Sequence, residues 1–85
     1  MPFAPIRLDD YVRRYQSHNA GTDPAELRRR LQTMLRAFRE GARCACGEPI
    51  WVIGSAEAGL ACFTCVTGEA DPSEDFELEE ACLGR

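Results

Sequence analysis

The chain has 85 residues, a net charge of −4, five cysteines and 45% hydrophobic residues. This length holds one domain with a small core, so a disulfide, a metal ion or a second subunit is expected to add stability. An odd cysteine count excludes full pairing within the chain. Residues 1–5 do not resemble a secretory signal, and no apolar run approaches the roughly 20 residues that cross a membrane. We therefore expect a reduced, cytoplasmic protein whose close cysteine pairs bind metal.

A short helix is predicted over residues 10–16, after a segment that the prolines at positions 2 and 5 keep extended. Asp9 or Asp10 can cap this helix. Its apolar residues recur at the spacing of a modest helical face: Tyr11, Val12 and Tyr15.

The clearest helix signal covers residues 24–40. Asp23 at the N-cap, Pro24 at the first helical position and Gly41 beyond the end match the chemistry of helix termini. Such a helix is about 25 Å long. Its apolar residues follow at three- or four-residue spacing and form one face to bury: Leu27, Leu31, Met34, Leu35 and Phe38.

The later part of the chain carries patterns that are typical of strands. Residues 49–53 are apolar, β-branched and aromatic, residues 55–58 would form a hairpin loop, and residues 59–61 lead into the second cysteine pair. Residues 75–79 alternate polar and apolar side chains, as a half-buried third strand does. We expect residues 80–85 to form a frayed tail.

Four cysteines form two close pairs, Cys44 with Cys46 and Cys62 with Cys65. Zinc takes four thiolates at tetrahedral angles, about 2.3 Å from each sulfur. The CxxC pair aims both sulfurs at one point, and the CxC pair can do so because residues i and i+2 of an extended chain face the same side. Gly47 follows the first pair, where a side chain would obstruct the turn. The pattern predicts one zinc ion; iron is also compatible with four thiolates, and small buried cysteines or disulfide chemistry are the other interpretations.

The stretch Cys44-Ala45-Cys46-Gly47 followed by Cys62-Phe63-Thr64-Cys65 resembles the knuckles of zinc ribbons, over roughly residues 43–79. By position, Cys44 and Cys46 would form the first knuckle, whose spacer is one residue shorter than usual, and Cys62 and Cys65 the second. The same stretch is similar to small uncharacterised bacterial proteins, which implies no function. Its four cysteines are also similar to the zinc switch of redox-regulated heat-shock chaperones.

Charge is divided along the chain. Residues 1–43 carry nine arginines against five acids, a balance of +4, and residues 44–85 carry nine acids against one arginine, a balance of −8. The basic flank of the helix over 24–40 could contact nucleic-acid phosphates. A solvated face, or arginines paired with acids of the same chain, suits a chain of pI about 4.9 better. The candidate partner-binding residues are Arg28, Arg29, Arg36, Arg39 and Arg43.

Three other residues have ordinary expected roles. Cys82 lies among acids and is expected to be an idle residue of the tail, and His18 is expected to be a cap or surface residue. Trp51 is expected to pack the hairpin against Leu31 or Phe38. No residues match a catalytic constellation, and a four-cysteine site leaves no open position for substrate, so we expect no enzymatic activity.

These observations predict one α+β domain over residues 1–85. One or two helices within residues 1–43 would pack on a three-stranded antiparallel zinc ribbon over residues 44–79. The expected function is that of a non-catalytic interaction module with structural zinc, whose partner is a protein or a second copy of the chain. A nucleic-acid adaptor and a zinc-thiolate redox switch are the alternatives, and no membrane partner is expected.

Overall fold

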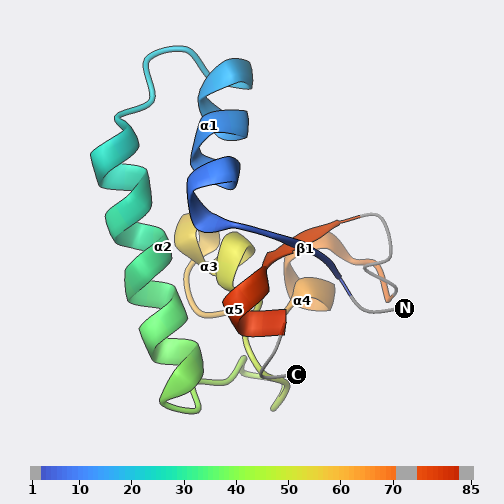
Figure 1. The fold of residues 1–85 in the computed structure, drawn as a ribbon. Helices are drawn as coiled ribbons and strands as arrows, with labels where there is room; N and C mark the ends of the chain where they lie inside the picture. Colours follow the sequence, from blue (N-terminus) through green and yellow to red (C-terminus); the bar gives the residue numbers. More distant parts are fainter. Residues whose placement is uncertain (1–2, 71–74, 83–85) are drawn as a thin grey trace.

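The fold combines two long N-terminal helices with a group of short elements (Figure 1). The computed structural model describes residues 3–70 and 75–82. Helices α1 (Leu8–His18) and α2 (Pro24–Arg39) lie antiparallel and side by side. The short elements gather beside them: β1 (Ala4–Ile6), α3 (Val52–Ala58), α4 (Phe63–Thr67), β2 (Phe76–Leu78) and α5 (Glu79–Cys82).

Within the described residues, the sheet has two parallel strands, so the predicted three-stranded antiparallel ribbon is wrong. β1 pairs with β2, with Ala4 opposite Phe76 and Ile6 opposite Leu78. A strand was predicted near β2, but its partner comes from the start of the chain instead of from a hairpin. Parallel strands require a crossover connection, and here all elements from α1 to α4 lie between the two strands in sequence.

The apolar run over 49–53, predicted to be a strand, leads into helix α3. Residues 50–56 are all buried, and a short apolar run suits a helix packed on several sides as well as it suits a strand. Glu77 of β2 stabilises the helical choice. It is fully buried, and its carboxylate accepts hydrogen bonds from the backbone amides of Val52 at 2.8 Å and Ile53 at 3.2 Å, two of the amides that a helix start leaves unpaired.

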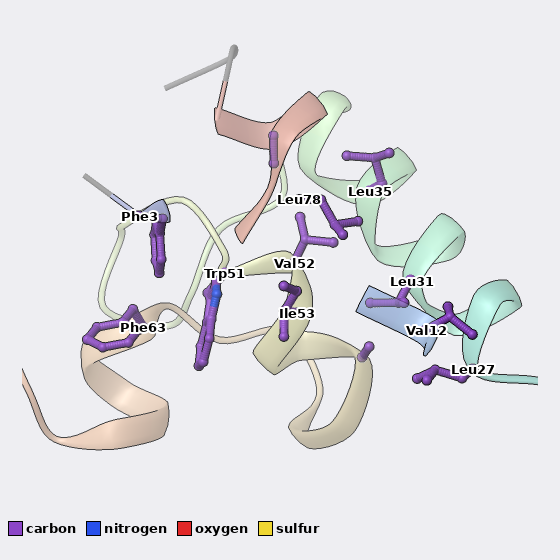
Figure 2. Packing of buried hydrophobic residues seen from close by; sticks show 12 residues of the cluster. Phe3, Val12, Leu27, Leu31, Leu35, Trp51, Val52, Ile53, Phe63 and Leu78 are labelled. Atoms are coloured by element: carbon purple, nitrogen blue, oxygen red, sulfur yellow. The ribbon is translucent and has the colours of Figure 1, made fainter. Parts of the chain in front are cut away.

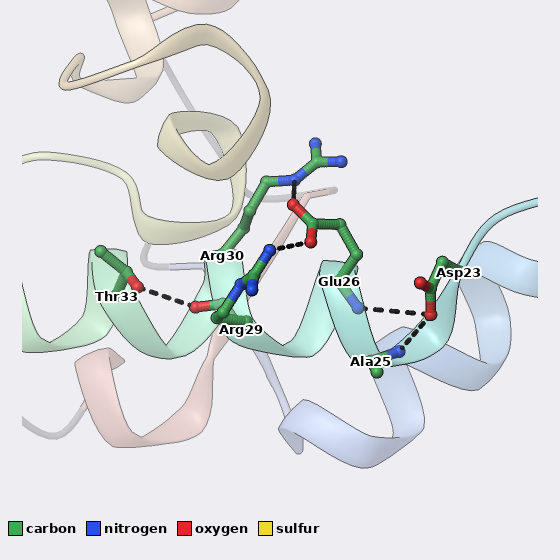
Figure 3. Close-up of polar contacts among 6 residues, drawn as sticks. All are labelled: Asp23, Ala25, Glu26, Arg29, Arg30 and Thr33. Atoms are coloured by element: carbon green, nitrogen blue, oxygen red, sulfur yellow. Dashed lines mark hydrogen bonds and ion pairs between the residues drawn. The ribbon is translucent and has the colours of Figure 1, made fainter.

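Helix α2 confirms the prediction for residues 24–40. The Asp23 carboxylate accepts hydrogen bonds from the amides of Ala25 at 3.0 Å and Glu26 at 3.4 Å (Figure 3), and Gly41 follows the helix with a φ of +89°. Helix α1 is longer than predicted. It begins after Arg7, which makes no side-chain cap, so the expected cap by Asp9 or Asp10 is wrong. Both acids lie in the first turn of the helix, where their negative charge interacts favourably with the helix dipole.

The core lies between α2 and the short elements (Figure 2). Leu27, Leu31 and Leu35 of α2 are at most 5% exposed, and burying a side chain of this size contributes about 1.5–3 kcal/mol. Their neighbours in the cluster come from α1, α3, β2 and α5: Val12, Val52, Ile53, Leu78 and Ala81.

The C-terminal residues in the described part of the chain form a packed helix. Residues 80–82 belong to α5, and Ala81 is fully buried, so the predicted frayed tail is wrong for these residues. The rest of the predicted tail, residues 83–85, lies outside the described residues.

Candidate metal centre

The structure brings together the four cysteines that the sequence singled out. The sulfur atoms of Cys44, Cys46, Cys62 and Cys65 all lie within 4.8 Å of one another. The Sγ atoms of Cys46 and Cys62 are 3.5 Å apart, although the two residues come from different segments. Cys44 and Cys62 are buried, whereas Cys46 and Cys65 are exposed, so the cluster has an inner and an outer side.

The first cysteine pair sits in a tight turn. The Cys44 amide donates to the Glu48 carbonyl at 2.7 Å, and the Gly47 amide donates to the Cys44 carbonyl at 2.9 Å. Gly47 has a φ of +96°, a conformation that disfavours any residue with a side chain, as predicted for this position. The Arg43 guanidinium donates to the Gly47 carbonyl at 2.8 Å and holds the turn from outside. These hydrogen bonds define the backbone of the turn that carries the first two sulfurs.

The second pair is positioned by two helices. Ser55 of α3 exchanges two hydrogen bonds with Ala61, donating from its hydroxyl at 3.0 Å and accepting from the Ala61 amide at 3.2 Å. The next residue, Cys62, is the N-cap of α4, and Cys65 lies within that helix. The predicted second knuckle of a hairpin is thus a helix start, which also brings two sulfurs to one point.

Mutual interactions perturb the thiols in opposite directions. The pKa of Cys44 is lowered to about 6, chiefly by the backbone amides of Cys46 and Cys62 and by the thiol of Cys65. The thiols of Cys44, Cys62 and Cys46 raise the pKa of Cys65 to about 12. The pKa of Cys46 is also raised: the Glu48 amide lowers it, but the thiols of Cys62 and Cys44, together with burial, raise it by more. One sulfur ionises readily and further ionisation is opposed, a repulsion that a bound cation would relieve.

The donor set fits a metal ion. A tetrahedron with metal–sulfur bonds of 2.3 Å has sulfur–sulfur edges of about 3.8 Å. The observed 3.5 Å contact and the 4.8 Å limit bracket that value. Four thiols at such distances could hold one soft or borderline ion without moving the backbone far, and they would leave no position for another ligand.

An aromatic cluster packs beside the cysteines. Trp51 stacks on Phe3, with ring centroids 5.8 Å apart, and meets Phe63 edge-on at 5.0 Å. Its indole N–H donates to the Phe76 carbonyl at 2.9 Å. Trp51 was predicted to meet Leu31 or Phe38; its ring neighbours are Phe3 and Phe63, and Figure 2 shows Val52 and Ile53 between Trp51 and Leu31. The tryptophan therefore supports the second cysteine segment through Phe63.

The predicted basic flank is largely engaged within the chain. Arg39 pairs with Glu80 at 2.5 Å, Arg28 with Asp9, and Arg29 with Glu26 (Figure 3). Arg43 holds the first cysteine turn, and Arg36 lines a hollow between α2 and α5 with Arg39. Exposed ion pairs are weak, but a phosphate would still have to displace these carboxylates. Three of the five arginines thus pair with carboxylates of the same chain.

The remaining predicted residues lie outside the cluster. His18 ends α1 and is exposed, with Nδ1 3.0 Å from the Arg14 carbonyl and 3.1 Å from the Ser17 hydroxyl. Cys82 is half-buried in α5, and its thiol donates weakly to the Glu77 carbonyl at 3.8 Å. Cys82 is thus a packed residue of a helix and does not belong to an idle tail.

Two residues that support the site were not predicted from the sequence. Glu77 holds the start of α3, and Phe3 covers Trp51 and Phe63. An acid inside an alternating strand pattern is expected to face solvent, so no local signal marked Glu77 as buried. Phe3 lies in a segment without helical or strand periodicity long enough to indicate packing.

Comparisons with protein families, with curated proteins and with solved structures gave no match to this chain. Among the residues that the structure describes, no helix combines the length and the apolar character needed to cross a bilayer. The class of protein is therefore defined by the fold and the site: a small α+β domain in which four convergent cysteines could hold a metal ion.

Proposed function

We propose that this protein is a non-catalytic interaction module whose fold is organised by one zinc ion on Cys44, Cys46, Cys62 and Cys65, and that it acts by binding another protein. The observation that carries the proposal is the convergence of four sulfurs from two separate segments within 4.8 Å. A closed set of four thiolates is typical of structural zinc and leaves no site for metal catalysis. The free thiols suit a reducing compartment such as the cytoplasm.

The metal would join two segments of the fold that are separate in sequence. The first pair follows α2 and the second opens α4, so an ion on both pairs ties the end of the long helix to the segment around Phe63. Structural zinc contributes on the order of 10 kcal/mol or more in small domains at neutral pH. This contribution is larger than the stability that a small hydrophobic core usually provides.

Metal analysis of the purified protein tests the proposal directly. We expect one zinc per chain and four thiols that become reactive towards a thiol reagent only after chelation. An intensely coloured protein that contains iron would show that the bound metal is iron and not zinc, and the four-cysteine site would stand. Four reactive thiols without any metal, in protein prepared under reducing conditions with zinc supplied, would refute the proposal.

Cysteine variants distinguish the site from general thiol chemistry. Cys44→Ser and Cys65→Ser should abolish stoichiometric zinc binding, because each removes one of four ligands. Cys82→Ser is the matched control, since Cys82 lies outside the cluster and should leave zinc content unchanged. Equal zinc content in all three variants would contradict the assignment of ligands.

A zinc-thiolate switch is the second candidate, and the exposure of Cys46 and Cys65 favours it. Peroxide would oxidise two thiols of the cluster, such as Cys46 and Cys62, to a disulfide: the sulfur–sulfur bond forms, the peroxide bond breaks, and two water molecules carry away the oxygens. The remaining ligands would then release the metal. Zinc release by peroxide that a dithiol reverses supports this candidate, and unchanged zinc retention under peroxide rules it out.

A further inference from the structure

A hollow of about 480 Å³ opens beside the cysteine cluster. The exposed residues Cys46 and Cys65 line one part of it, and the rings of Phe3 and Phe63 line another. Phe3 and Phe63 are themselves below 10% exposed and pack edge-on at 5.4 Å, so they form one packed wall. The volume accommodates one large apolar side chain with part of its backbone.

Exposed apolar side chains lie on the same segment of the chain. Among the described residues, the large hydrophobic side chains that remain exposed are Leu60, at 53%, and Val66, at 38%. Leu60 precedes Cys62 by two residues, and Val66 directly follows Cys65 in α4. Single exposed apolar residues are ordinary, but here both lie next to the second cysteine pair in sequence, and residues 64–70 are all exposed.

The charged residue in the lining of the hollow is acidic. Glu48 lines it, the sequence contains no basic residue from position 44 to position 84, and the guanidinium of Arg43 at the cysteine turn is engaged by the Gly47 carbonyl. Four thiolates on one divalent ion leave a local charge of about −2. Such a surface repels phosphates and attracts cationic groups, and sulfur atoms bound to a metal can accept hydrogen bonds from a guanidinium or ammonium group.

We infer that this hollow docks a basic segment of a partner protein, in which an apolar side chain packs on the wall that Phe63 and Phe3 form together and a neighbouring arginine or lysine faces Glu48 and the cysteine cluster. The inference rests on the proposed function, because the metal keeps the cysteine wall of the hollow in place. It adds to the proposed function the surface that binds the partner and the chemical character of the bound segment.

The test uses the zinc-loaded full chain and capped heptapeptides as probes. The main probe carries one leucine between two arginines; the controls replace the arginines by glutamates or the leucine by serine. Trp51 is the only tryptophan and packs against Phe63, so its fluorescence reports on the wall of the hollow. We expect the main probe to bind with a dissociation constant on the order of 100 μM, and each control to bind at least about tenfold more weakly.

Variants in the hollow locate the binding. Thr64 is exposed and lines the hollow, so Thr64→Arg places a positive charge there without touching the core; Glu48→Gln removes the lining carboxylate. Both should weaken the main probe by about tenfold or more. Glu79→Gln is the matched control, because it removes an equal charge from an exposed residue that does not line the hollow, and it should change binding by less than about twofold.

The outcomes separate the inference from the proposed function. Equal binding of the arginine and glutamate peptides, or no effect of Thr64→Arg, overturns the docking site even when one zinc per chain is retained. Self-association of the zinc-loaded chain that Thr64→Arg abolishes would assign the hollow to a second copy and also overturn it. Failure to bind zinc in the metal analysis refutes the proposed function itself, whatever the peptides do.

Discussion

Replacing Glu77 by glutamine removes a buried negative charge while keeping the size of the side chain. The carboxylate of Glu77 is fully buried in β2, and among the described residues it accepts backbone hydrogen bonds from Val52 at 2.8 Å, from Ile53 at 3.2 Å and from its own neighbour Leu78 at 3.0 Å. Two of these donors begin α3. The side chain therefore joins the sheet to the helix that carries Trp51 at its N-cap.

The cost of the change follows from the hydrogen bonds. Oε1 accepts from Ile53 and Leu78, and Oε2 accepts from Val52. The single oxygen of glutamine can replace only one of these two atoms, and its amide group then points at a backbone N–H. A hydrogen bond to a charged group contributes about 1.5–3 kcal/mol, and an unpaired buried donor costs about 1–3 kcal/mol. We expect Glu77→Gln to lower the free energy of unfolding by about 2–4 kcal/mol, a large part of the roughly 4–13 kcal/mol typical of a domain of this length.

Urea unfolding of the zinc-loaded protein, followed by circular dichroism and by Trp51 fluorescence, measures this change. Glu79→Gln is the control, since Glu79 lies two residues along the chain and is exposed; it should alter the unfolding free energy by less than about 0.5 kcal/mol. If Glu77→Gln were as stable as the control, the carboxylate would not hold α3, and the placement of β2 against this helix would be incorrect.

Three further perturbations test other parts of the fold. Gly54→Ala places a Cβ 2.3 Å from the Trp51 ring, so we expect overpacking to cost about 1–3 kcal/mol and to alter the near-ultraviolet circular dichroism of the indole; an unchanged spectrum would contradict this packing. Asp23→Ala removes the cap of α2 and should cost about 1 kcal/mol, or about 4–8 °C in Tm; no shift in a thermal melt would count against the cap. Burial, followed by the charge of Glu57, raises the pKa of Tyr11 to about 12. The neutral phenol is favoured in the folded protein, so its contribution to stability is complete below pH 10 and is lost as pH rises towards 12. In an absorbance titration, Glu57→Gln should lower the pKa of Tyr11. An unchanged titration curve would exclude the interaction between Tyr11 and Glu57.

The parts of the fold that local sequence patterns predicted are those with local causes. The start of α2 depends on Asp23 and Pro24, and its buried face on leucines four residues apart, all within one helix. The two cysteine segments were also predictable, because each pair is local and because four thiols in a short chain have few other uses. Their convergence did not require a correct prediction of the sheet.

The errors concern elements whose conformation is decided by distant residues. An apolar run ending in Val52 and Ile53 is compatible with a strand or with a buried helix, and Glu77 supplies the acceptors that favour the helix. β1 is only three residues long, includes Pro5, and finds its partner at the other end of the described chain. A proline is tolerated there because this strand pairs on one side only. No periodicity within either segment indicates the pairing.

The pairing of β1 with β2 sets an order on folding during synthesis. Residue Ala4 leaves the ribosome long before Phe76, and until then it has no strand to pair with. The cysteine turn, α3 and α4 all lie between these residues in sequence, so the four thiols can meet a metal ion while the sheet is still open. Glu77 arrives with β2 and would then fix the start of α3, which lies between the two cysteine segments in sequence.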